Sequence, residues 1–147
     1  EYNKGEINMS NKEKFEGLKK QRLQENEDKY GKEIRVKYGS ETVEESNKKF
    51  MNMTEQDFKK MQSIENDMFE DLIEVFNSGD LDSEKAKSVY EKHKAWLSFS
   101  WPSYSKEAHI GLAEMYVADE RFAKYYNDRA GKAVVTTLRD IIVKYAR

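Results

Sequence analysis

Apolar residues spaced three and four positions apart constrain the fold of this chain more than any other feature. The apolar positions that follow Thr54 are Phe58, Met61, Ile64, Met68, Leu72 and Val75. This spacing places the side chains on one face of an α-helix, which completes a turn every 3.6 residues. Similar stripes continue as far as Tyr145, and the alternation expected of a half-buried strand is nowhere sustained. The sequence therefore predicts an all-α fold.

Capping residues and glycines divide these stripes into five predicted helices. The side chains that can cap a helix N-terminus are Thr54, Asp82 or Ser83, Ser105 and Asp119. Gly79 and Gly131 stand where stripes end. Glycine ends helices readily because it accepts a positive φ without steric strain.

The first 52 residues differ from the rest because charged side chains dominate and apolar positions are sparse. Tyr30, Ile34 and Tyr38 repeat every four residues and so share a helix face, and Gly39 is a stop signal. Such a segment buries little apolar surface, and we expect it to be mobile when alone. It is either a solvated helical stalk or a lid that orders on binding. We therefore divide the chain into a charged N-terminal segment, 1–52, and a compact all-α domain, 53–147.

Composition excludes several classes of site. Charged residues make up 37% of the chain, yet the net charge is −2 with both signs interspersed, which argues against a nucleic-acid-binding surface. Cysteine is absent, so no disulfide, thiolate metal site or cysteine nucleophile exists. No apolar run is long enough to span a bilayer, and we expect a soluble, cytoplasmic protein. The chain starts at Glu1 rather than at a methionine, and we expect it to be a fragment.

The stretch 90–126 holds both tryptophans, both histidines and the only proline. Pro102 breaks the helical pattern because the residue before a proline is pushed out of the helical region. Trp96 and Tyr116 follow the stripes and suit a core. Trp101 and Tyr104 lie off the stripes, so they either plug the core or line a pocket for a small molecule.

His93 and His109 both fall on apolar helix faces. A metal site would need a third ligand aimed at the same point. We predict instead buried histidines that are hydrogen-bonded to the backbone or to a tyrosine. A haem pocket is the alternative for His93, because Trp96 and Leu97 would lie close to it. No motif for nucleophilic catalysis or phosphate binding is present, and we expect no enzyme activity, metal or cofactor.

Two motifs in this stretch carry a resemblance to a known family. They are His93-Lys94-Ala95-Trp96-Leu97 and His109-Ile110-Gly111-Leu112, the latter followed by Tyr116, Asp119 and Arg121-Phe122. From about Asn26 to the C-terminus, the chain resembles the TipAS antibiotic-recognition domain. That domain is the effector-binding half of thiostrepton-induced transcriptional regulators of the MerR family.

The resemblance implies a globin-like, all-α domain that binds bulky, mostly apolar antibiotics in a cleft. It also implies an N-terminal portion that folds over the ligand. The winged-helix DNA-binding domain and the dimerisation helix of such a regulator would precede this chain, and DNA would be contacted only through them. The full-length regulator is expected to be a homodimer, and the oligomeric state of this fragment stays open. No membrane partner is expected.

We expect aromatic side chains around the break to form the ligand cleft, with His109 offering a hydrogen bond at its rim. The predicted ligand-binding residues are Trp96, Phe99, Trp101, Tyr104, His109, Tyr116 and Met68. Some members of the family carry a cysteine that bonds covalently to a thiopeptide, and the matching position here is Tyr104. Covalent capture is therefore excluded, and a tyrosine there suits stacking on a flat aromatic ligand.

The leading hypothesis is an effector-binding domain of a transcriptional activator that senses hydrophobic antibiotics. A protein that protects by sequestering the drug would share the pocket without a DNA-binding partner domain. A haem or small-cofactor protein and a plain helical interaction module are the remaining alternatives.

Overall fold

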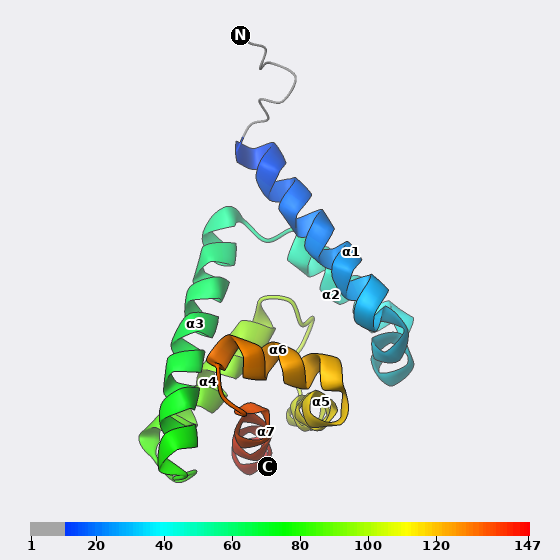
Figure 1. Cartoon of the computed structure of the whole chain (residues 1–147). Helices are drawn as coiled ribbons and strands as arrows, with labels where there is room; N and C mark the ends of the chain where they lie inside the picture. The colour runs from blue at the N-terminus through cyan, green and yellow to red at the C-terminus, as the bar shows by residue number, and fades with distance from the viewer. Residues whose placement is uncertain (1–10) are drawn as a thin grey trace. The chain divides into compact units, whose positions relative to one another are not determined.

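The computed structural model describes residues 11–147, and residues 1–10 of the predicted N-terminal segment lie outside that range. The described residues form seven helices (Figure 1). These are α1 (Asn11–Tyr38), α2 (Ser40–Met51), α3 (Glu55–Ser78), α4 (Glu84–Ser98), α5 (Lys106–Ala118), α6 (Glu120–Ala130) and α7 (Val135–Tyr145). No strand occurs within residues 11–147, which confirms the predicted all-α class. None of these helices is both long and apolar enough to cross a membrane.

The predicted helix starts carry the expected caps. Thr54, Ser83, Ser105 and Asp119 each accept a hydrogen bond from a backbone N–H two or three residues further on, over 2.9–3.2 Å. Each bond satisfies one of the N–H groups that have no partner inside the helix. Of the two candidates at positions 82 and 83, Ser83 is the cap of α4.

Three glycines end or separate helices as predicted. Gly39, Gly79 and Gly131 have φ values of 87°, 71° and 70°. These values lie in the left-handed region, where a residue with a Cβ is strained. The chain can therefore leave α1, α3 and α6 at these points.

The chain divides into two compact units. Unit 1 contains the residues up to Asp57 together with the short segment Ser100–Pro102. Unit 2 contains Phe58–Phe99 and Ser103–Arg147.

Unit 1 is a helical hairpin in which α2 folds back along α1 after the turn at Gly39 (Figure 1). Near the turn, Arg35 of α1 donates a hydrogen bond to Glu44 of α2 over 2.8 Å. Sequence reasoning missed α2 as a separate helix. Its large apolar side chains are Val43, Phe50 and Met51. Only Val43 and Phe50, seven residues apart, share a helix face, which is a weak signal on its own.

A buried lysine holds the open end of this hairpin. Lys19 of α1 is 1% exposed, and its ammonium group donates to the backbone oxygens of Met51 and Met53 over 2.5 and 2.9 Å. It also forms an ion pair with Glu16 at 3.0 Å. The carbonyl groups at a helix C-terminus have no partner inside the helix and carry a partial negative charge. Lys19 therefore acts as a cap for α2 that comes from the other helix.

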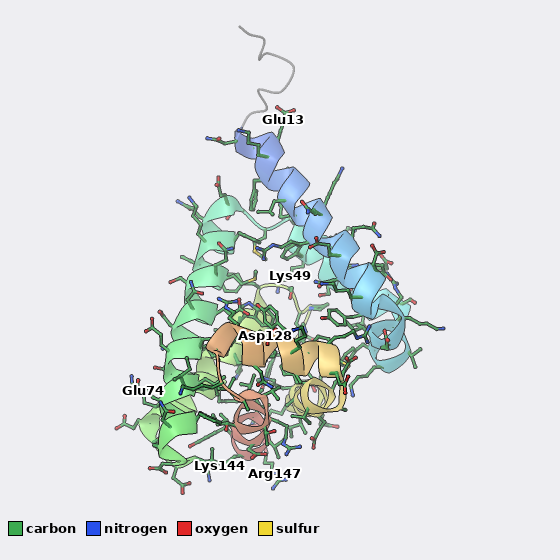
Figure 2. All side chains as sticks on the ribbon, in the orientation of Figure 1. Glu13, Lys49, Glu74, Asp128, Lys144 and Arg147 are labelled. Atoms are coloured by element: carbon green, nitrogen blue, oxygen red, sulfur yellow. The ribbon has the colours of Figure 1, made fainter. Side chains whose placement is uncertain are left out.

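Unit 2 has its core where α7 packs against α4, α5 and α6 (Figure 1). Aliphatic side chains from three helices of this unit are completely buried. They are Leu72 of α3, Val89 of α4, and Leu138, Ile141 and Ile142 of α7. Charged side chains, Glu74 of α3 and Lys144 of α7 among them, project outwards from the helices (Figure 2).

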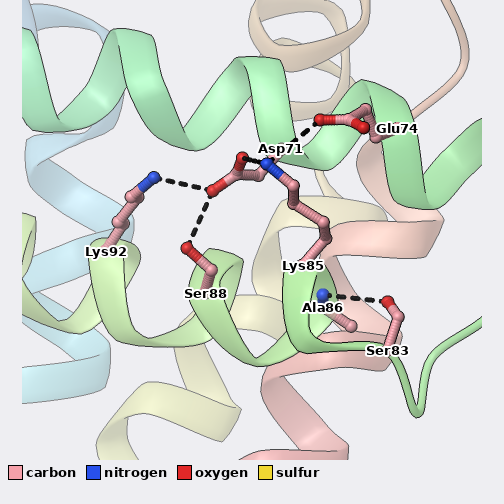
Figure 3. Close-up of polar contacts among 7 residues, drawn as sticks. All are labelled: Asp71, Glu74, Ser83, Lys85, Ala86, Ser88 and Lys92. Carbon is pink, nitrogen blue, oxygen red and sulfur yellow. Dashed lines mark hydrogen bonds and ion pairs between the residues drawn. The ribbon is translucent and has the colours of Figure 1, made fainter.

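A buried carboxylate joins α3 to α4. Asp71 is 5% exposed and accepts hydrogen bonds from Lys85 (3.2 Å), Ser88 (2.8 Å) and Lys92 (2.7 Å), as Figure 3 shows. Burial alone would raise the pKa of Asp71, but the bonds from Lys92, Ser88 and Lys85 outweigh burial and lower it. Asp71 is therefore ionised at neutral pH and fixes the two helices side by side.

A second carboxylate joins α3 to α6. Glu65 is 9% exposed and accepts hydrogen bonds from Arg129 over 2.6 Å and from the hydroxyl of Tyr125 over 3.0 Å. Together with Asp71, it gives α3 a polar contact with each of two neighbouring helices.

Candidate functional site

A continuous chain of hydrogen bonds runs through the interior of unit 2. It begins at the Tyr116 hydroxyl, which lies 3.2 Å from Nε2 of His93. His93 Nδ1 lies 2.8 Å from Nε2 of His109, and His109 Nδ1 lies 2.7 Å from the Tyr104 hydroxyl. The Tyr104 hydroxyl lies 2.7 Å from that of Tyr90. We call these five residues the Tyr–His chain.

Helix periodicity and one cap place these residues together. Tyr90 and His93 are three residues apart on one face of α4, and His109 and Tyr116 are two turns apart on one face of α5. Tyr104 directly precedes the α5 cap, so the start of that helix sets its direction. The sequence therefore brings four members onto two facing stripes.

Burial keeps both histidines neutral. His93 is 1% exposed and His109 is 0% exposed. Burial, followed by the charge of His109, lowers the pKa of His93 well below its ordinary value. Burial, followed by the charge of Lys94, lowers the pKa of His109 to about 4. Each ring therefore carries one proton at neutral pH and donates through one nitrogen while it accepts through the other.

The surroundings of Tyr104 also favour its neutral form. Burial, followed by its hydrogen bond with Tyr90, raises the pKa of Tyr104. The Nζ atom of Lys94 lies 4.6 Å from the centre of the Tyr104 ring, within the range of a cation–π contact.

These contacts confirm the prediction that the histidines are buried. Of the two kinds of partner predicted, the backbone or a tyrosine, each histidine has a tyrosine. Both nitrogens of His93 are engaged by protein groups, so neither is directed at an axial position of the kind that haem iron requires. Within residues 11–147, no group of three or more His, Cys, Asp or Glu side chains is placed to hold a metal ion. The chain of bonds is a polar network, and its chemistry is that of hydrogen bonding.

Aromatic rings surround the Tyr–His chain. The His93 and His109 rings stack at 4.9 Å between centres, and the Tyr90 ring stacks on His109 at 5.4 Å. The centre of the Trp96 ring lies 5.6 Å from that of the His93 ring. The centre of the Tyr116 ring lies 4.7 Å from that of the Tyr126 ring of α6. The polar chain is thus embedded in a cluster of rings drawn from several helices of unit 2.

The predicted ligand-binding residues of unit 2 fall into two groups. Trp96, Phe99 and Tyr104 are half-buried. The buried group consists of Met68 (1% exposed), His109 and Tyr116 (3%). His109 was expected at the rim of a cleft, whereas the structure places it inside, with both nitrogens bonded to members of the chain. Contact of any of these residues with a ligand stays a prediction.

Trp101 belongs to unit 1. Its ring lies 6.5 Å from the ring of Tyr38, at an angle of 54°, and its carbonyl oxygen accepts a hydrogen bond from Lys49 over 2.9 Å. The hydroxyl of Tyr38 is buried and has no hydrogen-bond partner within the described range. Burial raises the pKa of Tyr38 to about 12. Sequence reasoning noticed Tyr38 only as a position on a helix face.

Known proteins match almost the whole chain. A sequence profile of the TipAS antibiotic-recognition domain matches residues 30–145. Over 142 residues the chain is 28% identical to the HTH-type transcriptional activator TipA of Streptomyces coelicolor and to that of Streptomyces lividans. Each match covers 95% of this chain and 54% of the relative. The HTH-type transcriptional activator mta of Bacillus subtilis is 24% identical over 139 residues, 93% of this chain and 52% of the relative.

The chain therefore spans about half the length of the curated relatives it matches. No solved structure gives a significant match. The profile includes all five residues of the Tyr–His chain and the whole of α2 to α7, but only the C-terminal part of α1, from Tyr30 onward. This chain belongs to the TipAS antibiotic-recognition domain family.

Proposed function

We propose that this chain is the effector-binding domain of a transcriptional activator and that it senses hydrophobic antibiotics. The observation that carries the proposal is the family match over residues 30–145. The relatives are named as HTH-type transcriptional activators, and this chain corresponds to about half of each. DNA would then be contacted by a separate N-terminal domain of a homodimeric regulator, in agreement with the mixed charge of this chain.

The proposed ligand contacts in unit 2 are the half-buried rings of Trp96, Phe99 and Tyr104, together with the buried side chains of Tyr116, His109 and Met68. Half-buried rings support this assignment because they present apolar area that a ligand can still cover. The Tyr–His chain supplies polar groups next to these rings, and ligand sites commonly combine the two. Trp101 is a further proposed contact. The proposed role requires neither catalysis nor a cofactor.

The two tryptophans allow the proposal to be tested one unit at a time. Trp96 lies in unit 2 and Trp101 in unit 1, so Trp101→Phe leaves an indole that reports on unit 2 alone. Trp96→Phe leaves one that reports on unit 1. Each variant is titrated with a panel of hydrophobic antibiotics while tryptophan emission is recorded. We expect at least one compound to change the emission of Trp96 in a saturable manner. Unchanged emission of both indoles with every compound would contradict the proposal.

We further propose that the ligand stabilises the hairpin of α1 and α2. Residues 11–51 carry few buried apolar side chains, Val43 being one, and such segments open easily. Ordering of this segment would be offset by apolar area that the ligand covers. In the complete regulator, the change would reach the DNA-binding part as a shift between two states.

A further inference from the structure

The Tyr–His chain admits two arrangements of its protons. In the first, His109 and His93 both carry their proton on Nε2, so that Tyr104 donates to His109 and His93 donates to Tyr116. In the second, both rings carry their proton on Nδ1, and each of these bonds is reversed. The two rings must change together, because Nδ1 of His93 faces Nε2 of His109 and one of the two atoms must donate. Both arrangements contain the same number of protons.

A positive charge at one end of the chain favours the first arrangement. Lys94 lies over the Tyr104 ring, and its charge also acts on His109. An imidazole in this field is more stable when Nδ1 presents a lone pair toward the cation than when it presents an N–H. His109 Nδ1 is then the acceptor, and the Tyr104 hydroxyl is its donor.

The opposite end of the chain favours the same arrangement. When His93 donates to the Tyr116 oxygen, the Tyr116 proton is directed onward. The ring of Tyr126 is next to that of Tyr116. Burial raises the pKa of Tyr126, and so do the charge of Tyr116, the hydrogen bond with Tyr116 and the charge of Glu65. The Glu65 carboxylate thus stabilises protons that point toward this end. Charges of opposite sign at the two ends of the Tyr–His chain thus select one direction for all of its hydrogen bonds.

Tyr90 completes the arrangement at Tyr104. Its side chain is 7% exposed, and Tyr104 is its hydrogen-bond partner among the described residues. A buried donor without an acceptor costs more free energy than an unused lone pair of an oxygen that already takes part in a bond. Tyr90 therefore donates to Tyr104, and the Tyr104 proton is committed to His109.

We propose that Tyr104 determines ligand specificity by accepting a hydrogen bond, so that the site selects ligands that present an uncharged N–H or O–H donor beside an aromatic ring. This inference rests on the proposed function. A ligand whose polar atom is only an acceptor would have to reverse the bonds through both histidines. A cationic donor would be repelled by Lys94, which leaves indole-like, phenol-like and amide donors as the class that fits.

The direction of the hydrogen bonds in the Tyr–His chain is measured without any ligand. Long-range ¹H–¹⁵N correlation spectra of the histidine rings in the intact 147-residue chain at neutral pH identify which nitrogen carries the proton. We expect Nε2–H on both His93 and His109. Nδ1–H on either ring would overturn the proposal. The variant Lys94→Gln should increase the Nδ1–H share, whereas Lys87→Gln, an exposed lysine two turns earlier on α4, should not.

The donor preference is measured with two matched probes, indole and 1-methylindole, which differ in the N–H. Chemical-shift titrations with wild-type protein should show tighter binding of indole by between about 2-fold and 10-fold, the range for one neutral hydrogen bond. In Tyr104→Phe this ratio should fall to about 1, and in the control Tyr145→Phe, whose hydroxyl donates to the Leu81 oxygen, it should not change. Equal binding of the probes by wild-type protein would overturn the donor preference and leave the proposed function intact. If neither probe binds and no antibiotic binds in the emission titration, both the donor preference and the proposed function are overturned.

Discussion

At the scale of single residues, the environment of each histidine decides its chemistry more than its sequence context does. Both histidines were predicted to be buried and hydrogen-bonded to the backbone or to a tyrosine, since both lie on apolar helix faces. That each would bond the other was not predictable. The bond between His93 and His109 depends on the packing of α4 against α5 and on the angle of both rings, which no spacing in the sequence encodes.

The neutral histidines make stability depend on pH. Their pKa values are lower in the folded protein than the ordinary 6.5, so protonation favours the unfolded chain. The stabilisation is complete above pH 6.5 and is lost as the pH falls toward about 4, the pKa of His109. Between pH 7 and pH 5, the free energy of unfolding should decrease by about 2 kcal/mol for each histidine that stays neutral.

Urea unfolding at pH 7 and pH 5 measures this difference. The carboxylate of Asp71, whose pKa is lowered, loses its contribution only below about pH 4 and does not interfere. In His109→Gln, the difference in the free energy of unfolding between pH 7 and pH 5 should be about half of that in the wild-type protein. Equal free energies of unfolding at pH 7 and pH 5 in the wild-type protein would contradict the description of both rings as buried and neutral.

A second prediction at this scale concerns the Tyr38 hydroxyl, which is buried and has no hydrogen-bond partner in the described part of the chain. Removing such a group relieves a desolvation penalty. Tyr38→Phe should therefore raise the free energy of unfolding of unit 1 by about 1 kcal/mol. Trp101 emission in a Trp96→Phe background follows this unit in urea. A loss of stability instead would show that the hydroxyl has a partner in solution.

At the scale of helices, the sequence was informative where side chains act on their own helix. Thr54, Ser105 and Asp119 were recognised as caps and Gly79 as a stop because each acts within a few residues of its own position. The α2 helix was missed. Its C-terminus is stabilised by Lys19, 32 residues earlier than Met51, and a contact over that distance leaves no local pattern.

The Lys19 contact leads to a prediction for the hairpin of unit 1. Lys19→Met keeps the apolar part of the side chain and removes the ammonium group from the backbone oxygens of Met51 and Met53. Hydrogen bonds to a charged group contribute about 1.5–3 kcal/mol, so unit 1 should lose about 2 kcal/mol. Amide exchange in α2 should accelerate accordingly. Lys20→Met, at the exposed neighbouring position, should leave the exchange rates unchanged.

At the scale of the whole molecule, the family could be predicted from the sequence, whereas the unit to which Trp101 belongs could not. The mixed charge and the net charge of −2 predicted no nucleic-acid-binding surface in this chain, which spans about half the length of relatives named as HTH-type transcriptional activators. Membership of the family was predicted from the motifs around His93 and His109 and is confirmed over residues 30–145. The assignment of Trp101 to unit 1 was not predictable, because its neighbours Phe99 and Tyr104 belong to unit 2.

The most direct measurement is amide hydrogen exchange of the 147-residue chain with and without the antibiotic that changes tryptophan emission most. If the chain is an effector-binding domain whose hairpin is stabilised by its ligand, the amides of α1 and α2 should exchange at least about 10-fold more slowly in the complex, equivalent to about 1.4 kcal/mol. The amides of α4 and α5 around the Tyr–His chain should also be protected. Exchange rates in α1, α2, α4 and α5 that do not change at saturating antibiotic would contradict the account.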